Sequence, residues 1–394
     1  MNPYIEKLYK LSTKNERIII GLMSGTSLDG LDIAVCKISN FGADTKCEVT
    51  HFATISYSDE IKNKIRPVFS TETVELKYLT LLNPWIGTLH GHFINQKLTE
   101  WGIKNEDIDL IASHGQTIYH CPNSFHSFSD FNNGTLQIGD ADHIAAETNI
   151  ITLSDFRQKH IAAGFEGAPL AQYGDYNLFA NHQKDTLLLN IGGIANFTFI
   201  GKGYGVNDVI CSDIGPGNTL MDQYVQKHFG IDFDKDGEIA SKGVINSDLL
   251  DLLLSLSFIK QAMPKTTGPE LFNLELLEKL LSQINAEVSP HDIMATLNEF
   301  TANCIVKHIQ QLDITNSTDV LVSGGGAHNL AIVAKLQDKL GKHFRVLKLD
   351  ENGINADSKE AVLFAILANE TVMNANAGSK NGKQLTMGKI SLPL

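Results

Sequence analysis

The sequence of 394 residues is poor in cysteine and has no long apolar run. Its five cysteines are scattered and no two form a Cys-x-x-Cys pair, which argues against a disulfide framework or a zinc ribbon. Scattered thiols are typical of proteins from a reducing compartment. No apolar stretch approaches the roughly 20 residues that a membrane span needs, and Ile18–Ile20 is too short for a secretory signal. We therefore expect a cytoplasmic protein.

Basic residues are also scarce relative to acidic ones. The 32 Lys and Arg residues against 45 Asp and Glu residues give a formal net charge of −13. Such a chain is a poor general binder of nucleic acid or of anionic membranes, so we expect neither as a partner. The composition, 43% hydrophobic and 20% charged, is ordinary for a packed protein. The length suggests about two domains.

Two common nucleotide-binding motifs are missing. The chain contains no P-loop pattern and no Gly-x-Gly-x-x-Gly after a strand. It does contain two strand–turn–strand hairpins with glycine-rich turns, Gly21–Gly30 and Gly192–Gly193. The flanking strands are expected at Arg17–Ile20, Leu31–Cys36, Thr186–Asn190 and Ile194–Ile200. The wide separation fits two similar domains in tandem, and two unrelated hairpins would fit it equally well.

Strands alternate with helices along the chain, which predicts an α/β fold. Further strands are expected at Asp109–Ala112, Asp319–Ser323 and Leu385–Leu392. Apolar residues at helical spacing predict the helices. These are expected at Val74–Leu98, Asn218–His228, Asp248–Met263, Pro269–Ile284, Pro290–Ile309 and Ala361–Val372. The polar stretch Asn374–Lys383 is the best candidate for a linker.

The first glycine turn carries hydroxyl, amide and carboxylate groups that suit a phosphate site. It contains Ser24, Gly25, Thr26, Ser27, Asp29 and Gly30. Glycine lets the backbone approach a ligand closely, and free N–H and hydroxyl groups can donate to oxyanions. An ordinary hairpin turn is the alternative.

A second candidate is the run Asp213-Ile-Gly-Pro-Gly-Asn218. Asp213 could be a general base, or could hold Mg²⁺ through water. The alternative is that Asp213 caps the helix that follows. A cap does not need two glycines and a proline, so the pattern favours a functional aspartate.

Other polar motifs follow strands or begin helices. Gly324–Gly326 can lie flat against a ligand. His114 and Gln116 lie at the end of a strand, where ligand clefts form in α/β proteins, although a lone histidine is more often structural. Arg157 could bind a carboxylate or phosphate, or form a surface ion pair, and Glu360 could instead cap a helix. Asp232-x-Asp-x-Asp-Gly imitates a calcium loop, but its twelfth position is glycine, so no calcium site is predicted.

Together, the ordered motifs resemble the actin, Hsp70 and sugar-kinase superfamily, and in detail the anhydro-N-acetylmuramic acid kinase family. The matching runs are Gly21–Gly30, Ser113–Thr117, Leu136–Asp140, Asp155–Arg157, Gly167–Leu170, Leu189–Asn196, Asp213–Asn218, Pro264–Gly268 and Ser323–Asn329. The resemblance implies two actin-like (ribonuclease H-like) α/β domains with ATP in the cleft between them. We place these domains at 1–150 and 151–379, with 380–394 returning to the first.

The resemblance also implies a reaction. ATP and water would open the 1,6-bridge of 1,6-anhydro-N-acetylmuramic acid, and the freed 6-oxygen would take the γ-phosphoryl group to give N-acetylmuramic acid 6-phosphate, as in cell-wall sugar recycling. Mg²⁺ is implied as a cofactor, and a homodimer is left open. The implied catalytic residues are Asp213 and Glu360.

The remaining site residues are implied to bind ATP or sugar. Those expected to bind ATP are Gly25, Thr26, Ser27, Asp29, Gly30, Asp32, Gly192, Gly193, Gly215, Gly217, Asn218, Gly324, Gly325 and Gly326. Those expected to bind the sugar are His114, Gln116 and Arg157. No protein metal ligands are assigned.

The sequence departs from the family pattern around the expected sugar site. Differences occur at Gln158–Lys159, at Gly164–Glu166 and along Ala171–Tyr176. These changes affect the expected sugar contacts and leave the ATP motifs intact. The alternatives are therefore a kinase of another amino sugar, or an Hsp70-like or actin-like ATP-gated binding module.

Overall fold

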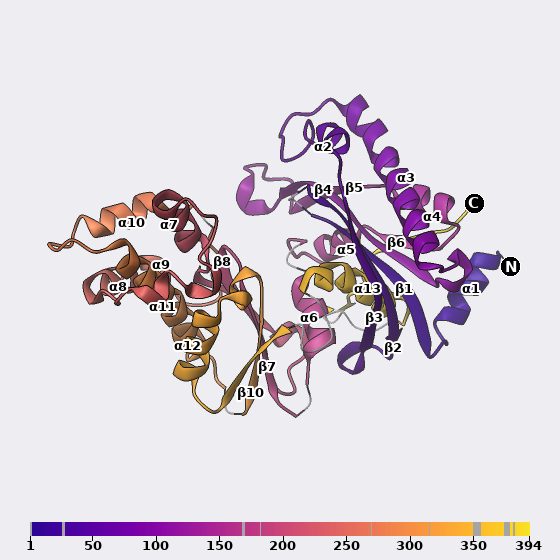
Figure 1. Ribbon diagram of the computed structural model, residues 1–394. Helices are drawn as coiled ribbons and strands as arrows, with labels where there is room; N and C mark the ends of the chain where they lie inside the picture. Colours follow the sequence, from indigo (N-terminus) through magenta and orange to yellow (C-terminus); the bar gives the residue numbers. More distant parts are fainter. Residues whose placement is uncertain are drawn as a thin grey trace. The chain divides into compact units, whose positions relative to one another are not determined.

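The structure, a computed structural model, describes residues 2–25, 28–167, 170–181, 183–268, 270–314, 316–349, 356–373, 379–380 and 383–394. The chain divides into two units (Figure 1). Unit 1 comprises Met1–Leu178 and Gly353–Leu394, and unit 2 comprises Phe179–Asn352.

Seven strands form the sheet of unit 1. They are β1 (Glu16–Ser24), β2 (Gly30–Ser39), β3 (Lys46–Ser56), β4 (Leu110–Cys121), β5 (Gly134–Ile138), β6 (Thr152–Ser154) and β14 (Lys389–Ser391). β1, β2 and β3 are antiparallel neighbours, and β4 and β6 continue the sheet parallel to β1. This gives the order β3-β2-β1-β4-β6, with β14 antiparallel to β6 at the edge and β5 paired to β4.

Helices supply the two hydrophobic layers of unit 1. They are α1 (Pro3–Leu11), α2 (Asp59–Ile65), α3 (Leu76–Trp101), α4 (Ala141–Thr148), α5 (Phe156–Ala162), α6 (Ala171–Phe179) and α13 (Lys359–Val372). Side chains such as Ile20 and Leu22 of β1 form a core with α2, α3 and α4. α13 packs against β1, β2 and β4. The approach is so close that a Cβ on Gly21 would lie 1.9 Å from the carbonyl oxygen of Ala361, so only glycine fits there.

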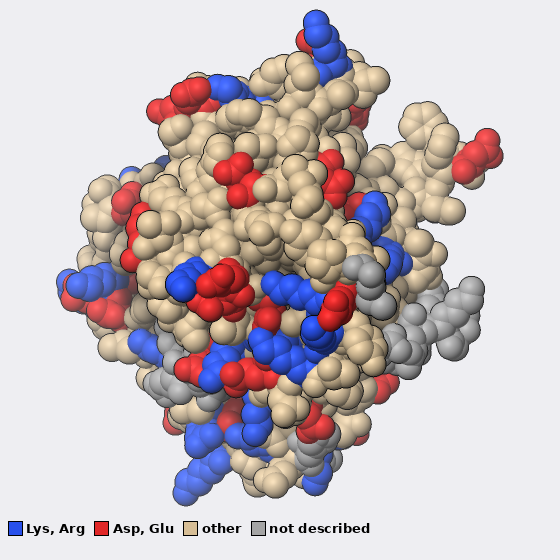
Figure 2. Space-filling model, turned by 90° about the vertical axis from the view of Figure 1, so that its right-hand side faces the viewer, with Lys and Arg blue, Asp and Glu red and all other residues tan. Residues whose placement is uncertain are grey.

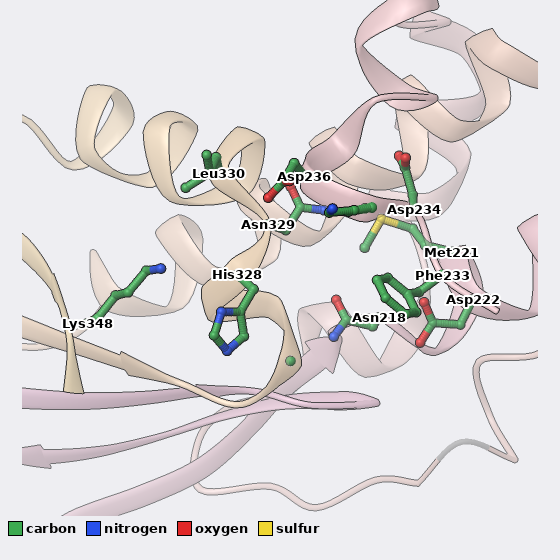
Figure 3. A pocket seen from close by; sticks show the side chains of 12 residues that line it. Asn218, Met221, Asp222, Phe233, Asp234, Asp236, His328, Asn329, Leu330 and Lys348 are labelled. Carbon is green, nitrogen blue, oxygen red and sulfur yellow. The ribbon is translucent and has the colours of Figure 1, made fainter. Parts of the chain in front are cut away.

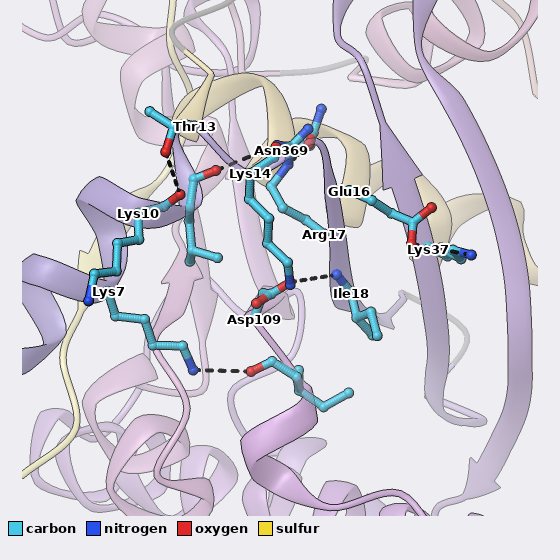
Figure 4. Close-up of polar contacts among 12 residues, drawn as sticks. Lys7, Lys10, Thr13, Lys14, Glu16, Arg17, Ile18, Lys37, Asp109 and Asn369 are labelled. Carbon is cyan, nitrogen blue, oxygen red and sulfur yellow. Dashed lines mark hydrogen bonds and ion pairs between the residues drawn. The ribbon is translucent and has the colours of Figure 1, made fainter.

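A buried polar cluster fastens α13 to the beginning of β1 (Figure 4). The fully buried Arg17 donates from Nε to Asn369 Oδ1 at 2.6 Å. Beside it, Asp109 accepts from Lys14 Nζ at 2.6 Å and from the backbone N–H of Ile18 at 2.8 Å. Because buried charges are costly unless hydrogen-bonded, this cluster fixes the position of the last helix on the first sheet.

Unit 2 repeats the sheet of unit 1 in a smaller form. Its strands are β7 (Asp185–Ile191), β8 (Ile194–Ile200), β9 (Ile210–Pro216), β10 (Thr318–Ser323) and β11 (Phe344–Lys348). β7, β8 and β9 are antiparallel neighbours, and β10 and β11 run parallel to β7. The order β9-β8-β7-β10-β11 therefore matches β3-β2-β1-β4-β6 of unit 1 in position and direction. This repetition confirms the predicted fold class of two similar α/β domains.

The helices of unit 2 include α7 (Thr219–Phe229), α8 (Ser247–Leu254), α9 (Ser257–Lys260), α10 (Leu274–Leu281), α11 (Pro290–Ile309) and α12 (Leu330–Leu340). They form one continuous core with the sheet, in which α11 is buried along most of its length. The helix begins with Ser289 as its N-cap and Pro290 in its first turn, as the sequence predicts.

Three predicted boundaries differ from the structure. A domain boundary near 150 would cut β6 from the sheet to which it is hydrogen-bonded, so unit 1 extends to Leu178. The single helix predicted at 248–263 is two, because Leu256 is extended (φ −53°, ψ 140°) between α8 and α9. The helix predicted from 269 begins only at Leu274, where Asn273 Oδ1 accepts from the N–H of Leu276 at 2.9 Å. Most of the predicted linker 374–383 lies outside the described residues.

The surface carries charges of both signs. Figure 2 shows a face on which acidic and basic side chains lie intermingled, without a broad patch of one sign. Within the described part of the chain, no helix is long and apolar enough to cross a membrane.

Candidate active site

The first glycine turn of unit 1 connects β1 to β2, and its two central residues, Thr26 and Ser27, lie outside the described residues. A Cβ on Gly30 would lie 2.4 Å from the carbonyl oxygen of Ile55, so glycine is required where the turn meets β3. Gly25 ends the described part of the turn on the β1 side.

A chain of buried side chains holds the beginning of this turn. Ser24 Oγ donates to Gln116 Oε1 at 2.6 Å, because an amide oxygen can only accept. Tyr57 OH then donates to Ser24 at 2.8 Å and accepts from His90 Nε2 at 2.8 Å. Gln116 Nε2 in turn donates to the carbonyl oxygen of Gly25 at 3.0 Å. The amide of Gln116, predicted to bind sugar, is thus engaged within unit 1, and its oxygen and nitrogen both hold the turn.

Carboxylates gather beside the turn. Asp32 accepts from Thr54 Oγ1 at 2.5 Å. Its pKa is raised by burial, and the nearby charge of Asp29 adds to the rise. Glu360, in the first turn of α13, also has a raised pKa. The main cause is burial, and the nearby charge of Asp32 adds to it. The beginning of α13 has no side-chain cap hydrogen bond, and the side chain of Glu360 has no hydrogen-bond partner among the described residues, so the alternative of a helix cap is not what the structure has.

Arg157 lies near Glu360. Burial lowers the pKa of Arg157, and the negative charge of Glu360 partly offsets this by favouring the charged guanidinium. Arg157 Nε donates to His114 Nε2 at 3.0 Å, and Nη1 donates to the carbonyl oxygen of Gly167 at 2.8 Å. It forms no salt bridge with the described residues, whereas the neighbouring Asp155 is paired with Lys389. The alternative of a surface ion pair therefore applies to Asp155, and Arg157 keeps a donor group to spare.

The glycine turns of unit 2 are bonded to one another through the backbone. The N–H of Gly217 donates to the carbonyl oxygen of Gly193, and that of Asn218 to the carbonyl oxygen of Gly192, both at 2.8 Å. A Cβ on Gly217 would lie 2.2 Å from that Gly192 oxygen, so glycine is obligatory. Thr301 of α11 supports the turn from behind by donating to the Gly217 carbonyl oxygen at 3.0 Å.

The three glycines after β10 have different roles. Gly324 has φ +79°, and a Cβ there would lie 2.6 Å from Asn190 Oδ1. A Cβ on Gly326 would lie 2.3 Å from the Ile191 side chain. At Gly325, by contrast, the nearest atom to an added Cβ is Asn218 Nδ2, at an ordinary 3.5 Å. The fold therefore requires glycine at 324 and 326 and leaves position 325 open.

Asp213 lies within β9 and does not cap α7, whose N-cap is Asn218. Its backbone N–H donates to the carbonyl oxygen of Lys265 at 2.9 Å, and its Oδ2 accepts from the N–H of Thr267 at 2.8 Å. Its other carboxylate oxygen has no partner in the described segments. Burial raises the pKa of Asp213, and the Thr267 hydrogen bond partly offsets this rise.

A cavity of about 630 Å³ lies in unit 2 beside Gly325. Figure 3 shows Asn218, Met221, Phe233 and Asp222 on one side of it, and His328 and Lys348 on the opposite side. Its size is in the range of small-molecule sites, and it combines apolar walls with a few polar groups. Burial raises the pKa of Asp222 to about 6.

The sequence profile of the family described as anhydro-N-acetylmuramic acid kinase matches residues 17–388.

The chain belongs to the anhydro-N-acetylmuramic acid kinase family.

Two named relatives of this family cover the whole length. The anhydro-N-acetylmuramic acid kinase of Pseudoalteromonas atlantica is 50% identical over 100% of both chains. That of Caldanaerobacter subterraneus is 38% identical over 98% of this chain and 100% of its own. Among solved structures, the activator of the 2-hydroxyisocaproyl-CoA dehydratase from Clostridium difficile is 13% identical, with a TM-score of 0.40 over 93% of this chain and 99% of its own.

Several residues of this family member were not found by sequence reasoning. Tyr57 and His90 lie far from any glycine motif in the chain and reach Ser24 only through the fold. Met221 and Asp222 look like ordinary residues of a helix, and only the fold brings them to the cavity. The run Pro264–Gly268 carries a signal, since it matches the family, and its Thr267 holds Asp213.

Proposed function

We propose that this protein catalyses the ATP-dependent hydrolytic opening and 6-phosphorylation of 1,6-anhydro-N-acetylmuramic acid. Water adds at the anomeric carbon as the bond from that carbon to the 6-oxygen breaks. The 6-oxygen then forms the bond to the γ-phosphorus of ATP, and ADP leaves. The products are N-acetylmuramic acid 6-phosphate, ADP and a proton.

The observation that carries this proposal is the state of Asp213. Its Oδ2 is held by Thr267 while its other oxygen is unpartnered within the described residues, which suits a group that must take a proton from water. Burial raises the pKa of Asp213, which makes the carboxylate a better proton acceptor than an exposed aspartate. A carboxylate so placed at the Gly-Pro-Gly turn supports water activation next to a phosphate site.

The bare backbone of unit 2 supports nucleotide binding. We assign the phosphates to the turns at Gly192–Gly193 and Gly215–Asn218, where added side chains at 192 and 193 would meet no atom closer than 3.6 Å. We assign the adenosine to the 630 Å³ cavity, whose lining includes Gly325. Gly324 and Gly326 stay predicted ATP-binding residues. Phosphoryl transfer needs mainly positioning and charge neutralisation, so glycine turns suit it.

Unit 1 supplies the candidate sugar contacts. We assign Arg157 and Glu360 to the sugar, because Arg157 keeps a donor nitrogen that has no partner in the described residues and Glu360 is likewise without a hydrogen bond. In unit 1, Gly25, Asp29, Gly30 and Asp32 remain predicted ATP-binding residues, as do Thr26 and Ser27 outside the described residues.

Mg²⁺ is proposed as the cofactor. It usually binds through one or two carboxylates together with substrate phosphates. A single carboxylate in either unit, such as Asp213 of unit 2 or Asp32 of unit 1, would suit such a role. The described residues contain no cluster of three or more His, Cys, Asp or Glu that would form an all-protein cage. When bound, Mg²⁺ would neutralise phosphate charge during transfer.

The test is ADP release by the purified protein with ATP and Mg²⁺. We expect release that depends on 1,6-anhydro-N-acetylmuramic acid and is far slower with N-acetylmuramic acid, which has no bridge to open. Equal rates with both sugars would reduce the protein to a plain sugar kinase. Release stimulated by a peptide and by no sugar would support the ATP-gated binding module.

Two further assignments belong to this proposal. We place the protein in the cytoplasm because its substrate ATP is made and used there, and the scattered cysteines fit that compartment. The homodimer stays a prediction, to be tested by light scattering of the purified chain.

A further inference from the structure

Arg157 is held through two of its three guanidinium nitrogens. Nε donates to His114 Nε2 at 3.0 Å and Nη1 donates to the Gly167 carbonyl oxygen at 2.8 Å. The third nitrogen, Nη2, has no partner within the described residues. A guanidinium donates in a rigid planar fork, so fixing Nε and Nη1 also fixes the direction of Nη2.

The contacts of His114 define where its proton lies. Its ring is only 2% exposed, and its Nδ1 lies 2.8 Å from the carbonyl oxygen of Gly115. A carbonyl oxygen can only accept, so Nδ1 carries the proton. Nε2 must then be the unprotonated nitrogen, which is the form that can accept from Arg157. A doubly protonated ring would lose this hydrogen bond and would face the arginine charge.

The surroundings keep the ring in this form. Burial lowers the pKa of His114 to about 3, and the charge of Arg157 adds to the effect, while hydrogen bonding to the backbone of Gly115 and Ser24 partly opposes it. Phe364 of α13 packs on the ring with centroids 4.7 Å apart. Gly115 has φ +78°, and a Cβ there would lie 2.6 Å from the Ile138 carbonyl oxygen. The backbone that presents the accepting carbonyl to Nδ1 therefore depends on glycine.

We propose that His114 is a positioning residue for Arg157. Its neutral, Nδ1-protonated imidazole accepts a hydrogen bond from Arg157 Nε and thereby aims Arg157 Nη2 at a carboxylate of the sugar. Muramic acid derivatives carry such a carboxylate on their lactyl ether, and a guanidinium suits it. This inference rests on the proposed function. It changes the predicted role of His114, whose two ring nitrogens are already engaged, from contact with the sugar to control of the residue that contacts it.

Two substitutions at His114 test the contributions of its two ring nitrogens separately. In His114→Asn, the side-chain amide can still donate to Gly115 but offers no acceptor to Arg157 Nε. In His114→Gln, the longer side chain places an acceptor oxygen near the position of Nε2. We expect His114→Asn to raise KM for the sugar about 10-fold, the order of one lost charge-assisted hydrogen bond, with KM for ATP unchanged. His114→Gln should recover most of the loss, and Arg157→Ala should set the upper limit.

A measurement on the unmodified protein accompanies the kinetics. The ¹⁵N chemical shifts of His114 should show a protonated Nδ1 and an unprotonated Nε2, unchanged from pH 8 to pH 5. A ring protonated on Nε2, or asparagine and glutamine variants with the same sugar KM, would overturn the inference. If the wild-type protein shows no sugar-dependent ADP release, the proposed function fails, while the ¹⁵N shifts still decide whether His114 holds Arg157 as described.

Discussion

The glycine turns of unit 1 and unit 2 occupy corresponding places in the same order of strands, but they are held by different kinds of contact. In unit 1, the side chains of Ser24, Tyr57, His90 and Gln116 form a buried chain that ends on the turn. In unit 2, the N–H groups of Gly217 and of the residue after it bond directly to carbonyl oxygens of the neighbouring turn.

Both turns are proposed to bind ATP, so the difference concerns how each turn is held. Phosphate groups are alike in all nucleotides, so a surface of bare backbone suffices to hold them. The sugar contact proposed for unit 1 lies apart from the turn, at Arg157. A sugar must be distinguished from others by its hydroxyl and carboxylate groups, which requires side chains aimed by further side chains. Substitutions at the cavity of unit 2 should therefore weaken nucleotide binding, and substitutions at Arg157 of unit 1 should weaken sugar binding. Loss of the proposed base Asp213 should lower turnover and leave ATP binding intact.

The largest effect is expected at Asp213, which gives unit 2 its proposed base. Asp213→Asn keeps the shape and removes basicity, so kcat should fall by at least ~10²-fold while ATP still binds. Asp251→Asn, on the exposed side of α8, is the matched control and should leave kcat unchanged. Turnover by Asp213→Asn near the wild-type rate would assign Asp213 a structural role.

The wild-type pH profile tests the same residue. A base must be ionised, so kcat should fall as pH falls through the pKa of Asp213. Because burial raises that pKa, the decline should begin at a higher pH than for an ordinary aspartate. The acid limb should be absent from the residual activity of Asp213→Asn.

The second largest effect is expected at Gly325, which is proposed to contact ATP, in contrast to Gly324, which the fold requires. Gly325→Val places a branched side chain at the cavity, where the fold leaves room for a Cβ, so the protein should fold and bind ATP at least ~10-fold more weakly. Gly324→Ala, at φ +79° and with a Cβ 2.6 Å from Asn190 Oδ1, should instead lower Tm. Calorimetric titration and thermal melts check both. Unchanged ATP affinity in a folded Gly325→Val would remove the cavity from the nucleotide site.

A smaller effect is expected in the side-chain network of unit 1. Tyr57→Phe leaves Ser24 without its donor and His90 Nε2 without its acceptor, both buried. The free energy of unfolding should fall by about 1–3 kcal/mol, the usual cost of unpaired buried groups. Tyr9→Phe, at a position 71% exposed, should change nothing measurable. Equal denaturant midpoints for the two variants would show that the network does not stabilise unit 1.

The smallest effect concerns Asp222, a carboxylate lining the cavity of unit 2. Its pKa is raised by burial from 3.8 to about 6, so folding favours the protonated form. Its contribution to stability is fully present below pH 3.8 and is lost as pH rises through about 6. Asp222→Asn should therefore raise Tm at pH 7 relative to wild type, with a smaller difference at pH 4. A Tm difference independent of pH would contradict the raised pKa.

The sequence predicted the recurring parts of the molecule well. Apolar spacing located α11, and the glycine turns located both hairpins, because those signals lie within a few neighbouring residues. The helix predicted over 248–263 failed because its leucines continue past the break at Leu256, where the backbone is extended. Hydrophobic periodicity indicates which face of a segment is buried, but it does not indicate where the helix breaks within that segment.

The site was predicted less completely than the fold. Asp213 and Arg157 stand in recognisable motifs. The structure shows that Asp213 is not a helix cap and that Arg157 is not part of a surface ion pair with the described residues. The partners Tyr57 and His90 could not be predicted, since they come together at Ser24 only after β3 has paired with β2 and α3 has packed on the sheet. For the same reason, the hydrogen bonds of His114 and Gln116 within unit 1 could not be predicted, and their direct contact with the sugar stays a prediction.

The most direct test of the proposed reaction follows the oxygen of water. The protein is incubated with ATP, Mg²⁺ and 1,6-anhydro-N-acetylmuramic acid in ¹⁸O-water, and the product is analysed by mass spectrometry before its reducing end exchanges with solvent. Bridge opening coupled to phosphorylation predicts ¹⁸O on the anomeric hydroxyl and none in the transferred phosphoryl group. Phosphorylated sugar without ¹⁸O at the anomeric carbon, or label only in inorganic phosphate, would contradict it.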